Sequence, residues 1–182
     1  MKSSVALIGF MGTGKTTVGE IIAGKLHKEF VELDTSIEQK AGRAIPEIFQ
    51  KDGEIVFRAL EIEATKEVVR KENTIIACGG GIVLNQINVD RLKQESIIIY
   101  LTATPKVILK RTSAQPEKRP LLHTISKPSQ VSRFLQFRHP FYERAADITI
   151  DTSELSINEV AERVITELQN HEDFSGKKPD SR

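Results

Sequence analysis

A stretch near the start of the chain has the residue types and the spacing of a loop that binds phosphate groups. Residues 9–16 read Gly-Phe-Met-Gly-Thr-Gly-Lys-Thr and fit the pattern Gly-x4-Gly-Lys-Thr. Glycines let such a loop curl until successive backbone N–H groups point at one anion, and the helix expected from Lys15 onward adds its positive end. We expect Lys15 to reach the β- and γ-phosphates of a nucleotide and the Thr16 hydroxyl to bind Mg²⁺. The nucleotide phosphates are expected to contact Gly12, Thr13, Gly14, Lys15, Thr16 and Thr17.

Two carboxylates lie at the end of the second strand-like run of the chain, residues 30–33. Glu32 and Asp34 are separated by one residue, and alternation along a strand would place both side chains on the same face. Beside a phosphate-binding loop, one carboxylate can hold Mg²⁺, directly or through water, and the other can take the proton of an acceptor hydroxyl. The alternative is that both are solvated loop acids.

Glycines and arginines supply a second set of candidates. Gly79, Gly80 and Gly81 follow the third strand-like run, where bare backbone lets a ligand approach closely and offers N–H donors; a flexible or strained turn is the alternative. Three arginines can form a fork-shaped clamp for a carboxylate or a phosphate, although the sequence alone does not show that they converge. These arginines are Arg58, Arg119 and Arg138.

Residues 113–127, which include Arg119, contain Pro116 and Pro120, are followed by Pro128, and have no helical or strand periodicity. We interpret them as a mobile lid between two helices, with a plain surface loop as the alternative.

The elements that must position these residues alternate between strands and helices. Short apolar runs predict strands, and residues with helical spacing of apolar side chains lie between them. This order predicts an α/β domain with a parallel five-stranded sheet covered on both faces, with ligands at the carboxyl ends of the strands. The predicted strands are 5–8, 30–33, 74–78, 96–101 and 147–150, and the predicted helices are 15–26, 54–71, 105–112, 127–145 and 157–168.

Length and composition set the limits of the interpretation. The chain of 182 residues suits one domain, which we place at residues 1–170, and the polar segment 171–182 is expected to be disordered. A net charge of +1 gives no overall positive charge that would attract a nucleic acid or a membrane surface. Cys78 is the only cysteine, which rules out an intrachain disulfide. With no signal peptide and no apolar run of about 20 residues, a cytoplasmic protein is expected.

Taken together, these segments resemble the bacterial shikimate kinases, which are P-loop small-molecule kinases. The resemblance runs in order from about Val5 to Leu168. It rests on residues 9–19, 34–38, 48–49, 52–54, 57–58, 79–81 and 119–122 and on the pattern Arg-x-Pro-x-Tyr at 138–142. It implies the P-loop kinase fold with a mobile lid, and transfer of the γ-phosphoryl group of ATP to the 3-hydroxyl of shikimate with Mg²⁺. That reaction is a step toward chorismate and the aromatic amino acids. The expected partners are ATP, ADP and shikimate, and the expected state is a monomer.

The resemblance also implies roles for single residues. Asp34 would bind the ring hydroxyls and act as the base, and Arg58 with Arg138 would grip the shikimate carboxylate. Family members usually carry Asp at the position of Glu32, whose longer arm can still hold Mg²⁺ through water. The remaining implied contacts are Gly79, Gly80 and Gly81 to the ring hydroxyls, Phe49 and Phe57 as pocket walls, Arg111 near the adenine and Arg119 over the phosphates.

Two other classes of protein remain as alternatives. One is another small-molecule P-loop kinase, of the gluconate or nucleoside-monophosphate type, because arginines bind phosphates as well as carboxylates. The other is a nucleotide-binding switch module, although the chain has no Asn-Lys-x-Asp motif for guanine.

Overall fold

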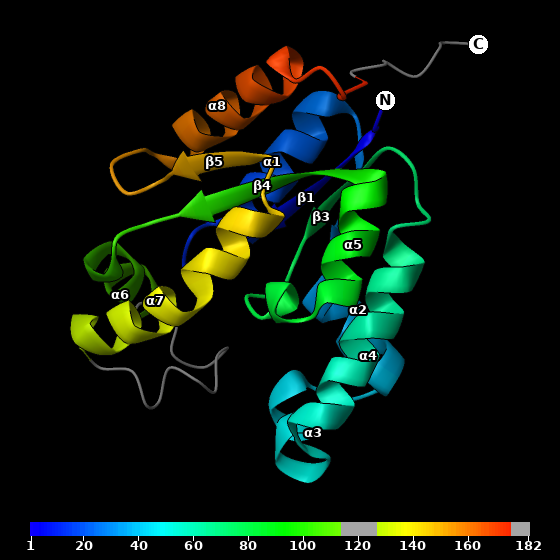
Figure 1. Cartoon of the computed structure of the whole chain (residues 1–182), viewed down its shortest axis with the longest axis vertical. Coiled ribbons are helices and arrows are strands. Elements are labelled where there is room, and N and C mark those ends of the chain that lie inside the picture. Colours follow the sequence, from blue (N-terminus) through cyan, green and yellow to red (C-terminus); the bar gives the residue numbers. More distant parts are fainter. Residues whose placement is uncertain (114–126, 176–182) are drawn as a thin grey trace.

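The computed structural model describes residues 1–113 and 127–175, and Figure 1 shows strands and helices alternating along them. The strands are β1 (Ser4–Ile8), β2 (Glu29–Glu32), β3 (Thr74–Ala77), β4 (Ser96–Thr102) and β5 (Ile148–Asp151). The α-helices are α1 (Lys15–Leu26), α2 (Leu33–Ala41), α3 (Ile45–Lys51), α4 (Gly53–Val68), α5 (Gln86–Glu95), α6 (Pro105–Ser113), α7 (Pro128–Ala145) and α8 (Ile157–Asn170). A short 3₁₀ turn, η1 (Ile82–Leu84), follows β3.

The five strands form one parallel sheet in the order β2-β3-β1-β4-β5. β1 lies at the centre, where Val5 is in register with Ile75 of β3 on one side and with Ile97 of β4 on the other. The chain runs from β1 to the β2 edge and later crosses to β4 on the other side of β1. A reversal of this kind opens a crevice at the carboxyl ends of the central strands, which is where ligands bind in such sheets.

Both faces of the sheet are covered by helices, as continuous apolar strands require. Alternate residues of β1 point to opposite faces: Leu7 packs with the apolar side chains of α1 and α8, and Ile8 with those of α4, α5 and α7. Figure 1 shows α1 with α8 on one side of the sheet and α4 with α5 on the other. None of the helices in the described part of the chain combines the length and apolarity that crossing a membrane requires.

The predicted strands and helices are present, with shifts of one to three residues at their ends. Helices α2, α3 and α5 were not predicted from the sequence, because all three are short, α2 and α5 are mostly polar, and α2 follows β2 without a loop. One consequence is a correction. β2 ends at Glu32, so Asp34 lies in the first turn of α2, and strand alternation does not relate the two carboxylates.

The C-terminal segment also differs from its prediction. Disorder was expected from His171 onward, but residues 171–175 pack on the domain, where Lys2 forms a β-bridge with Phe174. The Phe174 ring is buried in the apolar layer beneath α1 and α8, and the Lys28 ammonium lies 5.3 Å from its centre. Backbone hydrogen bonds with Lys2 and the burial of one aromatic ring together hold this otherwise polar segment, because they offset the cost of ordering the backbone. Residues 176–182 lie outside the described part of the chain.

Candidate active site

The loop between β1 and α1 (residues 9–14) has the backbone of an anion-binding cradle. Its three glycines, Gly9, Gly12 and Gly14, have φ of 144°, 76° and 96°, a region that other residues rarely enter. A side chain on Gly9 would also lie 2.2 Å from the Leu101 carbonyl oxygen of β4. These turns bring the loop to the N-terminus of α1, where the first N–H groups of the helix have no partner within the helix.

The Lys15 ammonium lies inside this loop. Its Nζ donates to the carbonyl oxygens of Gly9 and Phe10, both at 2.9 Å. The Thr13 hydroxyl donates to the same Phe10 oxygen at 2.8 Å. The loop therefore holds a positive charge next to the positive end of α1, which is an arrangement suited to a polyphosphate.

The two predicted metal-binding residues are in contact. The Thr16 hydroxyl, in the first turn of α1, donates to Glu32 Oε1 at 2.6 Å, and the Thr35 hydroxyl donates to Oε2 at 3.1 Å. Within residues 1–113 and 127–175 no group of three His, Cys, Asp or Glu side chains is placed to hold a metal. One hydroxyl and one carboxylate fit Mg²⁺, which usually binds to one or two protein oxygens together with substrate phosphates and water.

Asp34 faces the glycine segment that follows β3. A methyl group built on Gly79 would lie 2.7 Å from Asp34 Oδ1 and 3.7 Å from Glu61 Oε1. Although Asp34 lies on a helix and not on a strand, the structure brings it to the carboxyl ends of β2 and β3, close to the residues predicted to bind the same ligand.

Arg58 of α4 is held by two acids one turn away on either side. Its Nη1 donates to both carboxylate oxygens of Glu61, at 3.0 and 3.1 Å, and its Nε and Nη2 donate to Glu54 Oε1. The same guanidinium packs on Gly81, where an added methyl group would lie 2.6 Å from Nη1 and Nη2. Arg58 therefore reaches the glycine segment in a fixed orientation.

Glu61 is a site residue that the sequence reading missed. It is 1% exposed, although glutamate is rarely buried without a partner. Burial raises the pKa of Glu61, the nearby Asp34 carboxylate raises it further, and the Arg58 and Arg138 guanidinium groups oppose the rise. A signal existed in the sequence: Glu61 follows Phe57 by four residues and precedes Ala64 by three, which is the spacing of one buried helix face. Val56, which is apolar, is exposed away from this face of the helix.

α7 contributes two side chains to the glycine segment. Arg138 Nη1 donates to the Gly80 carbonyl oxygen at 3.4 Å, and the buried Tyr142 hydroxyl donates to the same oxygen at 2.5 Å. The Arg138 guanidinium also lies 5.6 Å from the centre of the Phe10 ring in the phosphate-binding loop. Arg138 thus lies between the loop and the glycine segment. Tyr142 had no assigned role in the sequence reading, and the structure shows that it anchors Gly80.

The predicted aromatic walls stand beside Arg58. The Phe49 and Phe57 rings are 4.6 Å apart between centroids, and the Arg58 guanidinium lies 5.1 Å from the Phe57 ring centre. Phe57 is buried and Phe49 is partly exposed, so only Phe49 offers a large surface to a ligand in this structure.

Arg111 of α6 lies on another side of the phosphate-binding loop. Its Nη1 approaches the Gly12 carbonyl oxygen at 3.4 Å and the Thr152 hydroxyl at 2.9 Å, and its Nη2 donates to the Thr152 carbonyl oxygen at 2.7 Å. It therefore joins the loop to the segment between β5 and α8. Ile157 at the start of α8 is near the same loop, since a methyl group on Gly14 would lie 3.5 Å from its Cδ1. Of the predicted lid at 113–127, Ser113 ends α6 and Lys127 is the N-cap of α7, while residues 114–126, including Arg119, lie outside the described part of the chain.

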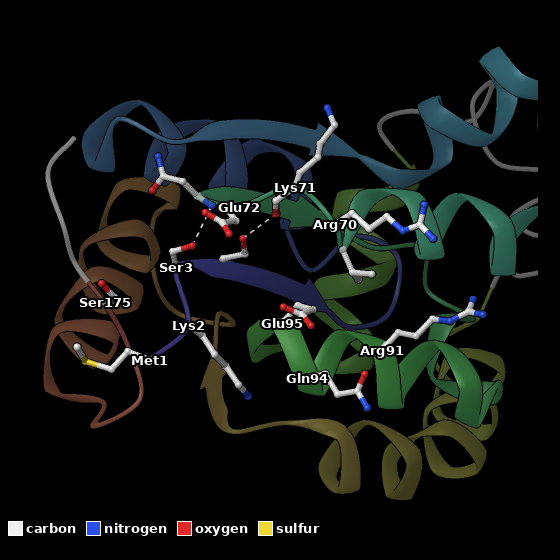
Figure 2. A pocket seen from close by; sticks show the side chains of 13 residues that line it. Met1, Lys2, Ser3, Arg70, Lys71, Glu72, Arg91, Gln94, Glu95 and Ser175 are labelled. Carbon is white, nitrogen blue, oxygen red and sulfur yellow. Dashed lines mark hydrogen bonds between the residues drawn. The ribbon is translucent and has the colours of Figure 1, made fainter. Parts of the chain in front are cut away.

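A groove of about 770 Å³ lies at the other end of the strands from this site, before the amino ends of β1, β3 and β4. No predicted site residue in the described part of the chain lines it. Its charges are mixed, and Figure 2 shows that Lys2 and Lys71 extend away from each other. The groove is therefore large, but its charged side chains do not point toward a common ligand. The candidate site at the carboxyl ends of the strands has charged side chains that meet at one segment.

Comparison with known proteins gives one consistent result. A family model described as shikimate kinase matches residues 11–169. The shikimate kinase of Caldanaerobacter subterraneus subsp. tengcongensis is 46% identical over 162 residues, which are 89% of this chain and 94% of that protein. That of Thermodesulfovibrio yellowstonii is 45% identical over 166 residues, 91% and 95% of the two chains.

A solved structure agrees with the sequence comparison. The shikimate kinase of Acinetobacter baumannii in complex with shikimate has a TM-score of 0.87 and 34% identity, over 95% of this chain and 96% of that one. The phosphate-binding loop, the parallel sheet and a match over nearly the whole length lead to one conclusion: the chain belongs to the shikimate kinase family.

Proposed function

We propose that this protein transfers the γ-phosphoryl group of ATP to the 3-hydroxyl of shikimate and so produces shikimate 3-phosphate and ADP. One observation supports this reading above all: Asp34, Arg58 and Arg138 reach the same three-glycine segment from three different helices. That arrangement puts an acid and two guanidinium groups beside the phosphate-binding loop, which suits an acceptor that carries both hydroxyls and a carboxylate.

The phosphate-binding half of the site positions ATP. The N–H groups of residues 12–17 and the positive end of α1 bind the phosphates, and Lys15 exchanges its loop carbonyl partners for phosphate oxygens. Thr16 and Glu32 would hold Mg²⁺, Glu32 directly or through water, and the ion would supply charge neutralisation at the phosphates. Arg111 lies beside the adenine.

The acceptor half of the site grips shikimate and takes its proton. Arg58 and Arg138 bind the carboxylate, Gly79, Gly80 and Gly81 contact the ring hydroxyls, and Phe49 and Phe57 form the pocket wall. As the 3-hydroxyl oxygen bonds to the γ-phosphorus, the bond from that phosphorus to the β,γ-bridging oxygen breaks, and the hydroxyl proton passes to Asp34. The ADP leaving group departs with the electron pair of the broken bond.

The remaining expectations belong to the same proposal. The domain spans residues 1–170 and acts as a monomer in the cytoplasm, without nucleic acid or membrane partners. The lid at residues 113–127 stays a prediction because 114–126 lie outside the described part of the chain; Arg119 would act there by stabilising charge on the phosphates in the transition state.

A coupled ADP-release assay tests the proposal. Shikimate, gluconate and nucleoside monophosphates are added singly to ATP and Mg²⁺, with Lys15→Met as the matched inactive control. We expect ADP release only when shikimate is the acceptor added. Turnover with gluconate or a nucleoside monophosphate instead would transfer the proposal to another kinase class, and slow hydrolysis indifferent to every acceptor would indicate a switch module.

A further inference from the structure

The glycines at 79–81 are not required by the conformation of their backbone. None of the three has φ in the left-handed region, unlike Gly9, Gly12 and Gly14 of the phosphate-binding loop. Gly81, for example, has φ −96° and ψ −1°, in the bridge region that residues other than glycine also occupy in turns. At Gly79 and Gly81 glycine instead matters for the space that a side chain would occupy.

That space is filled by two charged side chains of the site. A methyl group on Gly79 would lie 2.7 Å from Asp34 Oδ1, and one on Gly81 would lie 2.6 Å from both terminal nitrogens of Arg58. Both separations are too short for a carbon atom in contact with nitrogen or oxygen. Gly80 differs, because the nearest atom to its added methyl group would be the Gly9 carbonyl oxygen at 3.5 Å, an ordinary contact.

The atoms in the way are the far ends of flexible side chains and not backbone. An added methyl group would therefore displace a carboxylate or a guanidinium and leave the strand, the glycine segment and η1 in place. Arg58 is also tied to Glu54 and Glu61, so its guanidinium has few other positions that keep those bonds. Each substitution thus moves one functional group.

We propose that Gly79 and Gly81 are positioning residues that act by lacking a side chain: Gly79 leaves the seat of the Asp34 carboxylate open, and Gly81 that of the Arg58 guanidinium. The inference rests on the proposed function, in which Asp34 accepts the proton and Arg58 binds the shikimate carboxylate. The glycine segment then does more than contact the substrate through its backbone. Gly79 positions the group that accepts the proton, and Gly81 positions the group that binds the carboxylate.

The test is a comparison of Gly79→Ala with Gly81→Ala by steady-state kinetics. Gly79→Ala should lower kcat by about tenfold to a hundredfold, since a shift of about 1 Å at a reacting group has effects of that size. Gly81→Ala should raise the KM for shikimate by about tenfold or more, with kcat at saturation changed by less than about threefold. Gly24→Ala, on the exposed face of α1 with no atom within 4 Å of the new methyl group, is the matched control and should change neither.

Double-mutant cycles separate this inference from a structural effect. Gly79→Ala should have no further effect on kcat or on shikimate binding once Asp34→Ala has removed the displaced side chain, and Gly81→Ala should have none after Arg58→Ala. In the crossed pair, Gly79→Ala with Arg58→Ala, the effects of the two substitutions on kcat and on shikimate binding should add.

Three results would overturn the inference. One is a pair of glycine variants with the same kinetic signature, and another is additivity within the matched cycles. The third is a loss of folding in either variant, since only side-chain ends should need to move. If Asp34→Ala and Arg58→Ala themselves leave kcat and KM near wild type, the proposed roles fail and this inference fails with them. If they act as proposed while the glycine variants do not, this inference alone fails.

Discussion

Arg58→Ala should reduce the stability of the free protein as well as its affinity for shikimate. The substitution leaves the Glu61 carboxylate, which is 1% exposed, without the guanidinium that binds both of its oxygens. Removal of one partner of a buried ion pair costs about 3–5 kcal/mol. The Arg58 side chain is itself 21% exposed, so we expect a loss near the lower end, about 3 kcal/mol. For a chain of this size that loss corresponds to a melting temperature about 6–12 °C lower.

The same substitution should make stability depend on pH. Burial already raises the pKa of Glu61, with a contribution from Asp34, and Arg58 and Arg138 oppose the rise. Without Arg58 the pKa of Glu61 rises further. A carboxyl whose pKa is higher in the folded state stabilises the fold most below its unfolded pKa, and that contribution is lost as pH rises through the folded pKa. The deficit of Arg58→Ala relative to wild type should therefore be smallest at acidic pH, below the unfolded pKa of the carboxyl, and should grow as pH rises through the folded pKa.

Urea unfolding of the ligand-free protein across this pH range measures the effect. The matched control is Arg58→Ala in a Glu61→Gln background, where no buried charge is left behind and the cost should fall to about 1 kcal/mol. An equal loss in both backgrounds, or a loss that does not change with pH, would refute the view that a buried Glu61 charge makes Arg58 necessary to the fold.

Substitutions at other residues test separate parts of the site. Lys15→Met should abolish phosphoryl transfer without loss of fold, because Lys15 neutralises charge in the transition state; Lys25→Met is the surface control, and wild-type turnover would contradict the kinase mechanism. Arg119→Ala should lower kcat strongly while shikimate affinity without ATP stays near wild type, and a change confined to KM would contradict the lid contact. Gly80→Ala should fold normally, since the nearest atom is 3.5 Å away, yet weaken shikimate binding by about tenfold as measured by calorimetry. Unchanged affinity would mean that shikimate does not lie on this backbone.

Local sequence determined the parts of the protein whose residues are close together along the chain. The phosphate-binding loop was predictable because its backbone shape depends on glycines at 9, 12 and 14, and Lys15 begins the next helix as predicted. The start of α8 was equally local: Ser156 and Glu159 form the capping box that their spacing indicates. Short apolar runs determined the strands, since a strand covered on both faces leaves no polar position in its middle.

Tertiary structure alone decided where the acceptor half of the site lies. Asp34, Arg58 and Arg138 are each ordinary charged residues in sequence, and their meeting at the glycine segment depends on how α2, α4 and α7 pack against the sheet. The burial of Glu61 was missed because a charged residue on a helix usually faces water, and only a guanidinium and the surrounding core make the buried position tolerable. Contacts between residues far apart in the chain depend on the packing of whole elements, which the pattern of a single segment does not contain.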